Sequence, residues 1–203
     1  MNQNAIQNIR IIELFKQKLP FSKLKFKYFT KKHYAVTALR EKDRWEITLV
    51  LEALPKPIEK QSEGGLFQDF VDEPCVFAAE LEGKQVGWIE LGFQKWNNRM
   101  RIWELLVEER FRRKGIGTLL VDHAVKLSKK RKARMLVVET QSCNIPAINF
   151  YLKNGFELIG FDSGAYSNED TKRREVRLEF GLKIKGNLSS KSGLPVFQAS
   201  GNS

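Results

Sequence analysis

The segment between residues 100 and 140 constrains the fold of this chain more than any other part of the sequence. An apolar run from Met100 to Val107 is followed by a basic, glycine-containing turn from Arg112 to Gly117. Apolar residues then recur at helical spacing, at Ile116, Leu119, Leu120, Ala124 and Leu127. Met135 to Glu139 has the composition of a short buried strand. A strand, a helix and a second strand in this order form a right-handed crossover between parallel strands. The segment therefore predicts an α/β protein.

Further strands are expected on both sides of this segment. Cys75–Leu81 and Gln85–Phe93 flank Glu82-Gly83-Lys84, which is typical of a β-hairpin. The other predicted elements are a helix from about Pro146 to Asn154 and strands over Phe156–Phe161 and Glu175–Ile184. This order of elements indicates a mixed central sheet flanked by helices.

The first third of the chain has weaker periodicity. His33–Leu39 and Trp45–Leu51 are rich in β-branched and aromatic residues, and we expect two strands there. Pro55 and Pro57 are expected to end the second strand, because proline has no amide hydrogen to donate to a ladder. Gln61–Gly65 is expected to be a loop.

The domain organisation follows from these differences along the chain. We predict one domain over residues 1–185, with an additional N-terminal segment of about residues 1–70 and a core over residues 74–184, where the secondary-structure signals are clearest. Residues 186–203 are rich in Gly, Ser and Asn and poor in apolar residues, so we expect a flexible tail.

The charge is strongly and unevenly basic. The chain carries 35 Lys and Arg against 24 Asp and Glu, a net charge of +11. Ten of the basic residues lie between Arg110 and Arg134, against one acid, Asp122. Such a stripe attracts nucleic acid, an acidic membrane surface or a phosphorylated cofactor, and it can equally be a solvated helix face. Phe111 is its one phenylalanine, and it has no tyrosine or tryptophan; a single ring is too few for a base-stacking platform, which argues against nucleic acid.

Several other classes of protein are disfavoured. No apolar run approaches 18 residues, and residues 1–7 lack the layout of a signal peptide. Cys75 and Cys143 are too few for a disulfide framework, and His33 and His123 have no partner at metal-binding spacing. We therefore expect a cytoplasmic protein with no metal, no membrane partner and no nucleic-acid partner.

The turn from Arg112 to Thr118 has the features of an anion site. The first amides of a helix lack partners and carry a partial positive charge. Gly115 and Gly117 would let a phosphate approach the backbone closely. The same turn could serve packing alone. It has neither the P-loop spacing nor the dinucleotide fingerprint, because Leu120 stands in the place of the third glycine.

The pattern Arg-x-x-Gly-x-Gly over Arg112–Gly117 resembles the acetyl-CoA-binding signature of the GNAT superfamily of N-acetyltransferases. Downstream, Asn144, Ala147 and the run Phe150–Phe156 resemble the signature Asn-x-x-Ala-x-x-Phe-Tyr-x-x-x-Gly-Phe of the same superfamily. Three further segments resemble streptothricin acetyltransferases: Lys95–Asn98, Glu139–Gln141 and Gly160–Asp162.

This resemblance implies the GNAT acyl-CoA N-acyltransferase fold, in which two parallel strands splay apart and hold the pantetheine arm of acetyl-CoA. It implies that backbone groups of one strand pair with that arm, at Leu105, Leu106 and Val107. It implies that the amides of the basic turn hold the pyrophosphate, at Arg112, Arg113, Lys114, Gly115, Ile116, Gly117 and Thr118. The remaining implied cofactor contacts are Asn144, Ala147 and Tyr151.

Acetyl transfer to an amine needs a base for the amine proton and an acid for the departing thiolate. Tyr151 matches the position of the family's acid, and its alternative role is packing on the sheet. Glu104 is the first candidate for the base, because an ionised side chain in mid-strand is costly unless its surroundings are polar. Glu104 could instead pair with Arg99 or Arg101.

Glu90 and Asp162 are reserve candidates for the base. Streptothricin acetyltransferases carry two adjacent acids on this strand, and Trp103 replaces the first of them here. The resemblance implies an acetyl-CoA-dependent N-acetyltransferase that acts by direct attack in a ternary complex. The acceptor would be a small-molecule amine of the streptothricin type or, second, a protein N-terminus or lysine. A homodimer is one option for the assembly, and a basic nucleic-acid-binding module is the alternative from another class.

Overall fold

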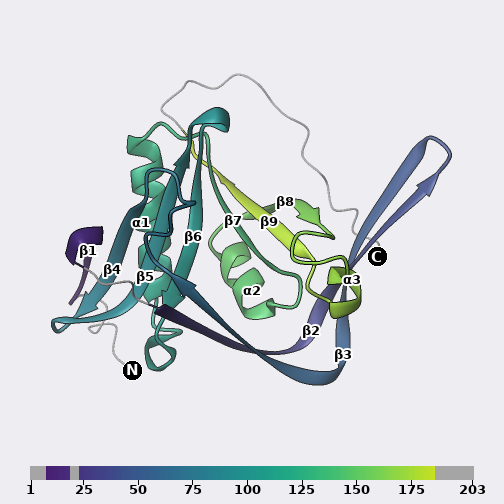
Figure 1. Ribbon diagram of the computed structural model, residues 1–203, viewed down its shortest axis with the longest axis horizontal. Helices are drawn as coiled ribbons and strands as arrows, with labels where there is room; N and C mark the ends of the chain where they lie inside the picture. The colour runs from purple at the N-terminus through teal and green to yellow at the C-terminus, as the bar shows by residue number, and fades with distance from the viewer. Residues whose placement is uncertain (1–7, 19–22, 186–203) are drawn as a thin grey trace, which may run out of the picture.

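The computed structural model describes residues 8–18 and 23–185 (Figure 1). The tail expected over 186–203 lies outside the described residues, so the domain boundary at 185 stays a prediction. No helix in the described ranges is long and apolar enough to span a bilayer.

A mixed sheet of seven strands forms the body of the protein. Its order is β1 (Ile9–Leu14), β4 (Cys75–Leu81), β5 (Lys84–Gln94), β6 (Arg99–Val107), β7 (Met135–Gln141), β9 (Arg177–Lys183) and β8 (Glu157–Asp162). Only β6 and β7 pair in parallel, and all the other neighbours are antiparallel. The predicted mixed sheet with one parallel pair is therefore confirmed.

In the part of the chain that the structure describes, three α-helices accompany this sheet: α1 (Ile116–Lys130), α2 (Ile145–Lys153) and the single-turn α3 (Asp170–Arg173). Short 3₁₀ turns lie at Lys16–Lys18, Lys95–Asn97 and Glu109–Phe111. The buried face of α1 packs on the sheet and forms the main core, together with Ile148 and Tyr151 of α2. The opposite face of the sheet is covered by a second cluster that includes Leu66, Phe67 and Trp88.

A separate two-stranded ribbon, β2 (Lys23–Glu41) and β3 (Arg44–Gly65), accounts for most of the N-terminal third. Its inner part, residues 23–30 paired with 58–65, crosses the body, and its outer part projects away from it (Figure 1). We call the first part the inner ribbon and the second, residues 32–53, the arm.

Two sequence expectations for this region were wrong. β3 does not end at Pro55 and Pro57, and Gln61–Gly65 is strand rather than loop. The ladder changes register between Thr30 and Lys32, so residues 54–57 oppose Lys31 alone. Prolines within this bulge need not donate ladder hydrogen bonds, which explains why the strand continues through them.

Candidate active site

The parallel pairing of β6 and β7 stops partway along both strands. The paired residues run from Arg99 opposite Met135 to Ile102 opposite Val138. Beyond them, residues 103–107 of β6 and 139–141 of β7 are not paired with each other, and we call these two ends the splay. The predicted separation of the two strands is present.

A β-bulge marks the start of the splay. Glu90 of β5 opposes Glu104, and the next residue, Leu91, opposes Ile102, so Trp103 is the extra residue of β6. A bulge bends its strand and increases the local twist. The ring of Trp103 packs edge-on against Phe70 with centroids 5.3 Å apart. The residue that departs from the streptothricin acetyltransferase pattern is therefore the one that redirects β6.

The backbone of β6 offers unpaired groups on its splay side. The amide of Glu108 donates to the carbonyl of Val86 on β5 at 3.0 Å. The amide and carbonyl groups of successive residues point to opposite edges of a strand. Those of Leu106 therefore also point toward β5, whereas those of Leu105 and Val107 point into the splay. The Val107 carbonyl accepts a hydrogen bond from Nε of Arg112 at 3.0 Å. Of the three residues predicted to pair with a ligand, Leu105 and Val107 have the right backbone direction.

The basic turn leads directly into α1. Gly115 precedes the helix with φ of 83°, a left-handed conformation that favours glycine, and no described side chain caps the first amides. A Cβ on Gly117 would lie 3.1 Å from the ring of Phe150. Arg113 and Lys114 are exposed, whereas Arg112 is tied down, because it also donates to the backbone carbonyl of Lys27 at 2.9 Å. The turn thus presents amides that no described side chain caps, and the missing side chain of Gly117 lets the Phe150 ring lie close to the start of the helix.

Glu104 and Glu90 lie side by side on the sheet face opposite α1. Glu90 is fully buried, and its Oε1 accepts a hydrogen bond from the Phe67 amide at 2.7 Å. Burial raises the pKa of Glu90. Burial, followed by the charges of Glu90 and Glu139, raises the pKa of Glu104 to about 7. Glu104 is therefore an acid that changes charge near neutral pH.

Tyr151 lies on α2 and is 7% exposed, with Phe150, Phe156 and Phe180 around its ring. Burial and then the nearby charge of Glu104 raise the pKa of its phenol, which keeps it protonated at neutral pH. The two residues that the sequence suggested for catalysis, on β6 and on α2, thus lie close enough for the charge of Glu104 to act on the Tyr151 phenol.

Asn144 begins α2 as its N-cap. Its Oδ1 accepts a hydrogen bond from the Ala147 amide at 3.3 Å, so both residues belong to one turn at the end of β7. Pro146 lies in the first turn, as its missing amide hydrogen allows. The helix predicted over 146–154 is confirmed to within one residue at each end.

The inner ribbon supplies residues near the splay that sequence reasoning missed. Tyr28 donates to Oε1 of Gln141 at 2.7 Å and lies 3.3 Å from Sγ of Cys143. A Cβ on Gly64 would lie 2.7 Å from Oε1 of Glu104. Lys60 forms an ion pair with Glu175. The strict alternation of lysine with Leu24, Phe26 and Tyr28 is a strand signal that could have indicated the inner ribbon.

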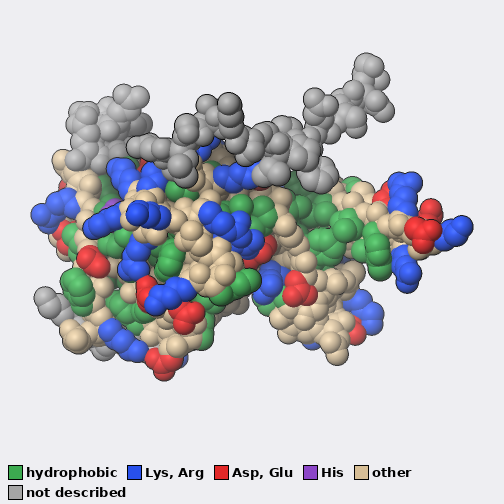
Figure 2. Space-filling model, turned by 90° about the horizontal axis from the view of Figure 1, so that it is seen from above, with side chains coloured by type: hydrophobic (Ala, Val, Ile, Leu, Met, Phe, Trp, Pro, Cys, Tyr) green, Lys and Arg blue, Asp and Glu red, His purple; other side chains and the backbone are tan. Residues whose placement is uncertain are grey.

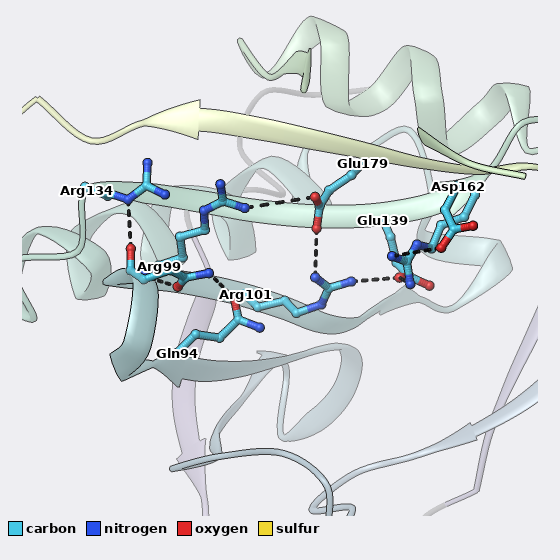
Figure 3. A network of polar contacts seen from close by, with 9 residues as sticks. Gln94, Arg99, Arg101, Arg134, Glu139, Asp162 and Glu179 are labelled. Carbon is cyan, nitrogen blue, oxygen red and sulfur yellow. Dashed lines mark hydrogen bonds and ion pairs between the residues drawn. The ribbon is translucent and has the colours of Figure 1, made fainter. Parts of the chain in front are cut away.

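An ion-pair network crosses β6, β7 and β9 at the sheet centre (Figure 3). Arg101 contacts Glu139 at 2.7 Å and Glu179 at 2.9 Å, and Arg177 contacts Glu139 at 3.4 Å. Arg177 also approaches Asp162 at 3.7 Å. Arg101 is therefore paired with Glu139 and Glu179 and not with Glu104, so the alternative in which Glu104 is its ion-pair partner is wrong.

The described residues contain no group of three or more His, Cys, Asp and Glu placed to hold a metal ion. Cys143 is fully buried, and burial raises the pKa of its thiol, which disfavours a reactive thiolate. His123 packs against Phe77 with ring centroids 4.3 Å apart.

Comparison with known proteins gives a family match over residues 39–156, to the acetyltransferase (GNAT) family. The streptothricin acetyltransferase of Streptomyces lavendulae is 30% identical over 117 residues, which span 58% of this chain and 62% of that protein. Streptothricin acetyltransferase A of Bacillus subtilis is 33% identical over 127 residues, 61% of this chain and 73% of that protein. An N-alpha-acetyltransferase of Sulfurisphaera tokodaii is 34% identical over 98 residues, 43% of this chain and 59% of that protein.

Two solved structures share the fold over most of the chain. The crystal structure of nourseothricin acetyltransferase superposes with a TM-score of 0.69 at 23% identity and covers 88% of this chain and 99% of its own. A Bacillus anthracis protein solved with acetyl coenzyme A superposes with a TM-score of 0.69 at 24% identity. The match covers 87% of this chain and 98% of that protein.

Proposed function

This chain belongs to the acetyltransferase (GNAT) family, and from that premise we propose that it transfers the acetyl group of acetyl-CoA to a primary amine. The observation that carries the proposal is the placement of Glu104 and Tyr151 beside the splay. A carboxyl group that titrates near neutrality and a buried phenol are the two proton-handling groups that direct attack of an amine on a thioester requires.

The splay and the turn fit a CoA thioester. Leu105 and Val107 offer backbone groups in the direction of an added strand, and the uncapped first turn of α1 suits a pyrophosphate. Acetyl-CoA supplies an activated acetyl group on a thiol that leaves as a thiolate.

Glu104 acts as the base in this proposal. A lysine-type amine has a pKa of about 10.4 and attacks only when neutral. A carboxyl group whose pKa is raised to about 7 is a better proton acceptor than an ordinary one, because its basicity is closer to that of the amine. Asp162 is less suited, since it is exposed and lies near Arg177.

Tyr151 stabilises the departing sulfur. Its raised pKa keeps the phenol protonated, so it can donate a hydrogen bond to the thiolate as charge develops there. Because the same shift makes the phenol a weaker acid, stabilisation by hydrogen bonding is favoured over early proton transfer.

A cationic small molecule of the streptothricin type is the acceptor we favour. Glu104 places a carboxyl group beside the splay of an otherwise basic chain, and in its ionised form it would attract a cationic amine. Two relatives with streptothricin acetyltransferase activity in their names support this choice. A protein N-terminus is the second candidate, supported by the Sulfurisphaera tokodaii relative.

The cellular setting we propose is the cytoplasm, where a CoA thioester and the two free cysteines would both be stable. We also propose that the active assembly is a homodimer.

The decisive experiment measures acetyl-CoA consumption by the full chain with a panel of amines: streptothricin, aminoglycosides, polyamines and peptides with free N-termini. Turnover with streptothricin and not with peptides supports the first acceptor. Turnover with peptides alone selects the second. Binding of acetyl-CoA without turnover of any amine would contradict the enzymatic proposal, and nucleic-acid binding that weakens steeply with salt would favour the basic module instead.

A further inference from the structure

The inner ribbon is bonded to both sides of the splay. On the β6 side, the Lys27 carbonyl accepts a hydrogen bond from Nη1 of Arg112 at 2.9 Å, and Nε of the same arginine is bonded to the Val107 carbonyl. On the β7 side, the Tyr28 phenol donates to Oε1 of Gln141 at 2.7 Å. The ends of β6 and β7 are not paired with each other in the splay. Two consecutive residues of β2 therefore connect the two strands where their own ladder has ended.

The same two contacts reach the two turns that the proposed cofactor site uses. Arg112 belongs to the basic turn before α1. Residues 141–144, which we call the β7–α2 turn, begin with Gln141, whose carbonyl accepts a hydrogen bond from the Asn144 amide at 2.8 Å. Asn144 caps α2 and is one of the residues that the family resemblance implies for contact with acetyl-CoA. One strand of the ribbon therefore links the two turns between which the cofactor would lie.

The strand β2 holds the β7–α2 turn at more than one point. Besides the bond from Tyr28, the Tyr34 amide donates to the Ser142 carbonyl at 2.9 Å. Between Tyr28 and Tyr34 the ladder is irregular at Thr30, whose buried hydroxyl donates to the Lys32 carbonyl at 2.7 Å. A bulge bends its strand, so β2 can follow the turn on both sides of the irregularity.

Beyond these contacts the ribbon leaves the body. The arm projects at the right of Figure 2, with charged side chains at its tip. A two-stranded hairpin is marginally stable in water by itself, so the body must hold the base of the arm. The bonds from Tyr28 and Tyr34 to the β7–α2 turn lie where the inner ribbon meets the arm, and they fix the ribbon against the end of β7.

The chemistry of Tyr28 suits a fixed hydrogen bond rather than proton transfer. Burial, followed by the contact with Cys143 at 3.3 Å, raises the pKa of the phenol, which therefore stays protonated and remains a donor. Its partner Gln141 donates in turn from Nε2 to Oε2 of Glu175 at 3.4 Å. Glu175 forms an ion pair with Lys60 of β3. Both strands of the ribbon thus reach the side chain of Gln141.

We propose that Tyr28 is a positioning residue for acetyl-CoA, because its bond to Gln141 holds the end of β7 at the separation from β6 that the proposed cofactor site requires. The inference rests on the proposed use of acetyl-CoA and adds to it a residue outside the family signatures. Tyr28 acts through Gln141 and the β7–α2 turn and takes no part in the chemical step. Loss of its hydroxyl should weaken the binding of acetyl-CoA and leave the chemistry unchanged.

Isothermal titration calorimetry of the full chain with acetyl-CoA tests the proposal without any acceptor. Tyr28→Phe removes the hydroxyl and keeps the ring, and we expect about 3- to 10-fold weaker binding, the worth of one hydrogen bond. In turnover, KM for acetyl-CoA should rise by a similar factor with kcat nearly unchanged. Tyr34→Phe is the matched control, because Tyr34 contacts the same turn through its backbone amide, which the substitution keeps. The control should bind acetyl-CoA as the natural protein does.

Gln141→Met removes the same bond from the β7 side. It should weaken acetyl-CoA binding by a similar factor, which keeps the test available if Tyr28→Phe does not fold. If the two side chains act through their shared bond, the double variant should bind no more weakly than the weaker of the two single variants.

Additive losses in the double variant would overturn the proposal, as would natural affinity in Tyr28→Phe. A fall in kcat with unchanged affinity would overturn it too, because Tyr28 would then act on the chemical step. A natural protein that binds no acetyl-CoA would contradict the proposed function itself, and this inference with it.

Discussion

Glu90 of β5 lies directly opposite Glu104 of β6, so two carboxyl groups share one face of the sheet beside the splay. One oxygen of Glu90 is bonded to the Phe67 amide, and the other is buried without a hydrogen-bond partner in the described part of the chain. Two close carboxyl groups resist simultaneous ionisation, so they titrate as a pair. Burial, and then the charge of Glu90, place the titration of Glu104 near neutral pH, where a base for an amine is useful.

Replacing Glu104 by Gln should remove the proton acceptor. We expect kcat/KM of the natural enzyme to fall as pH drops below about 7, because the pKa of Glu104 is raised to about 7 and the base must be ionised. Glu104→Gln should lower kcat/KM at neutral pH by about 10²–10⁴-fold. Activity should recover partly above about pH 9, where more of the amine is already neutral. The measurement is a pH–rate profile of both proteins.

The control for this variant is Glu157→Gln on the exposed surface of β8, which should keep the natural profile. Acetyl-CoA affinity should be unchanged in both. Equal losses at neutral and alkaline pH in Glu104→Gln would make Glu104 a structural or substrate-binding residue and return Glu90 or ordered water to consideration as the base.

Glu90→Gln should move the pH profile rather than abolish activity. The charge of Glu90 is the second cause, after burial, of the raised pKa of Glu104. Its removal lowers that pKa, so the acid limb of kcat/KM should shift to lower pH. The glutamine can still accept the hydrogen bond from Phe67 through its carbonyl oxygen. An unshifted acid limb would show that the two carboxyl groups are not coupled.

The same pKa shift links stability to pH. An acid whose pKa is raised in the folded state stabilises the fold below its unfolded pKa of 4.5, and this contribution is lost as pH rises through about 7. Relative to the natural protein, Glu104→Gln should therefore gain stability between pH 5 and pH 8, by up to about 3 kcal/mol. Urea unfolding at the two pH values measures the difference, and a constant difference would contradict it.

The sequence predicted the body of the fold because its signals there are local. Each signal there indicates one element from neighbouring residues alone. Examples are the glycines of the basic turn, the helical spacing from Ile116 to Leu127, and the proline and glycine at the two ends of α2. The ribbon could not be predicted in the same way. Pro55 and Pro57 end a strand by local rules, and only the register shift opposite Lys31 makes them compatible with β3.

The site was predictable in part for a related reason. Glu104 and Tyr151 stand in sequence patterns that can be compared with a family, and in the structure the charge of Glu104 raises the pKa of the Tyr151 phenol, after burial. Tyr28, Lys60 and Gly64 reach the splay only because the inner ribbon folds back over it, a long-range arrangement without a local signature. The bulge at Trp103 depends likewise on the register of a neighbouring strand.

Tyr151→Phe tests the role of the phenol. The ring packs among aromatic neighbours, and the substitution keeps that packing while removing the hydroxyl. We expect kcat to fall by about 10- to 10⁴-fold, with acetyl-CoA affinity nearly unchanged. Stopped-flow measurement of a single turnover separates the chemical step from product release. Full activity would leave Tyr151 as a packing residue only.

Gly117→Val should block the binding of acetyl-CoA by filling the space over the first turn of α1. Binding to the folded state raises the melting temperature of the natural protein, and this increase should disappear in the variant. The control is Gly160→Val on β8, where an added Cβ meets nothing within 4 Å. The control should retain the full increase.

The new side chain at Gly117 also crowds Phe150, whose ring would lie 3.1 Å from the added Cβ. A lower melting temperature of the unliganded variant could therefore come from packing alone. The double variant Gly117→Val with Phe150→Leu relieves that contact and leaves the obstruction over the helix amides in place. We expect it to recover thermal stability without recovering the response to acetyl-CoA. If the response returned with the stability, Gly117 would serve helix packing, and the pyrophosphate would have to bind elsewhere on the turn.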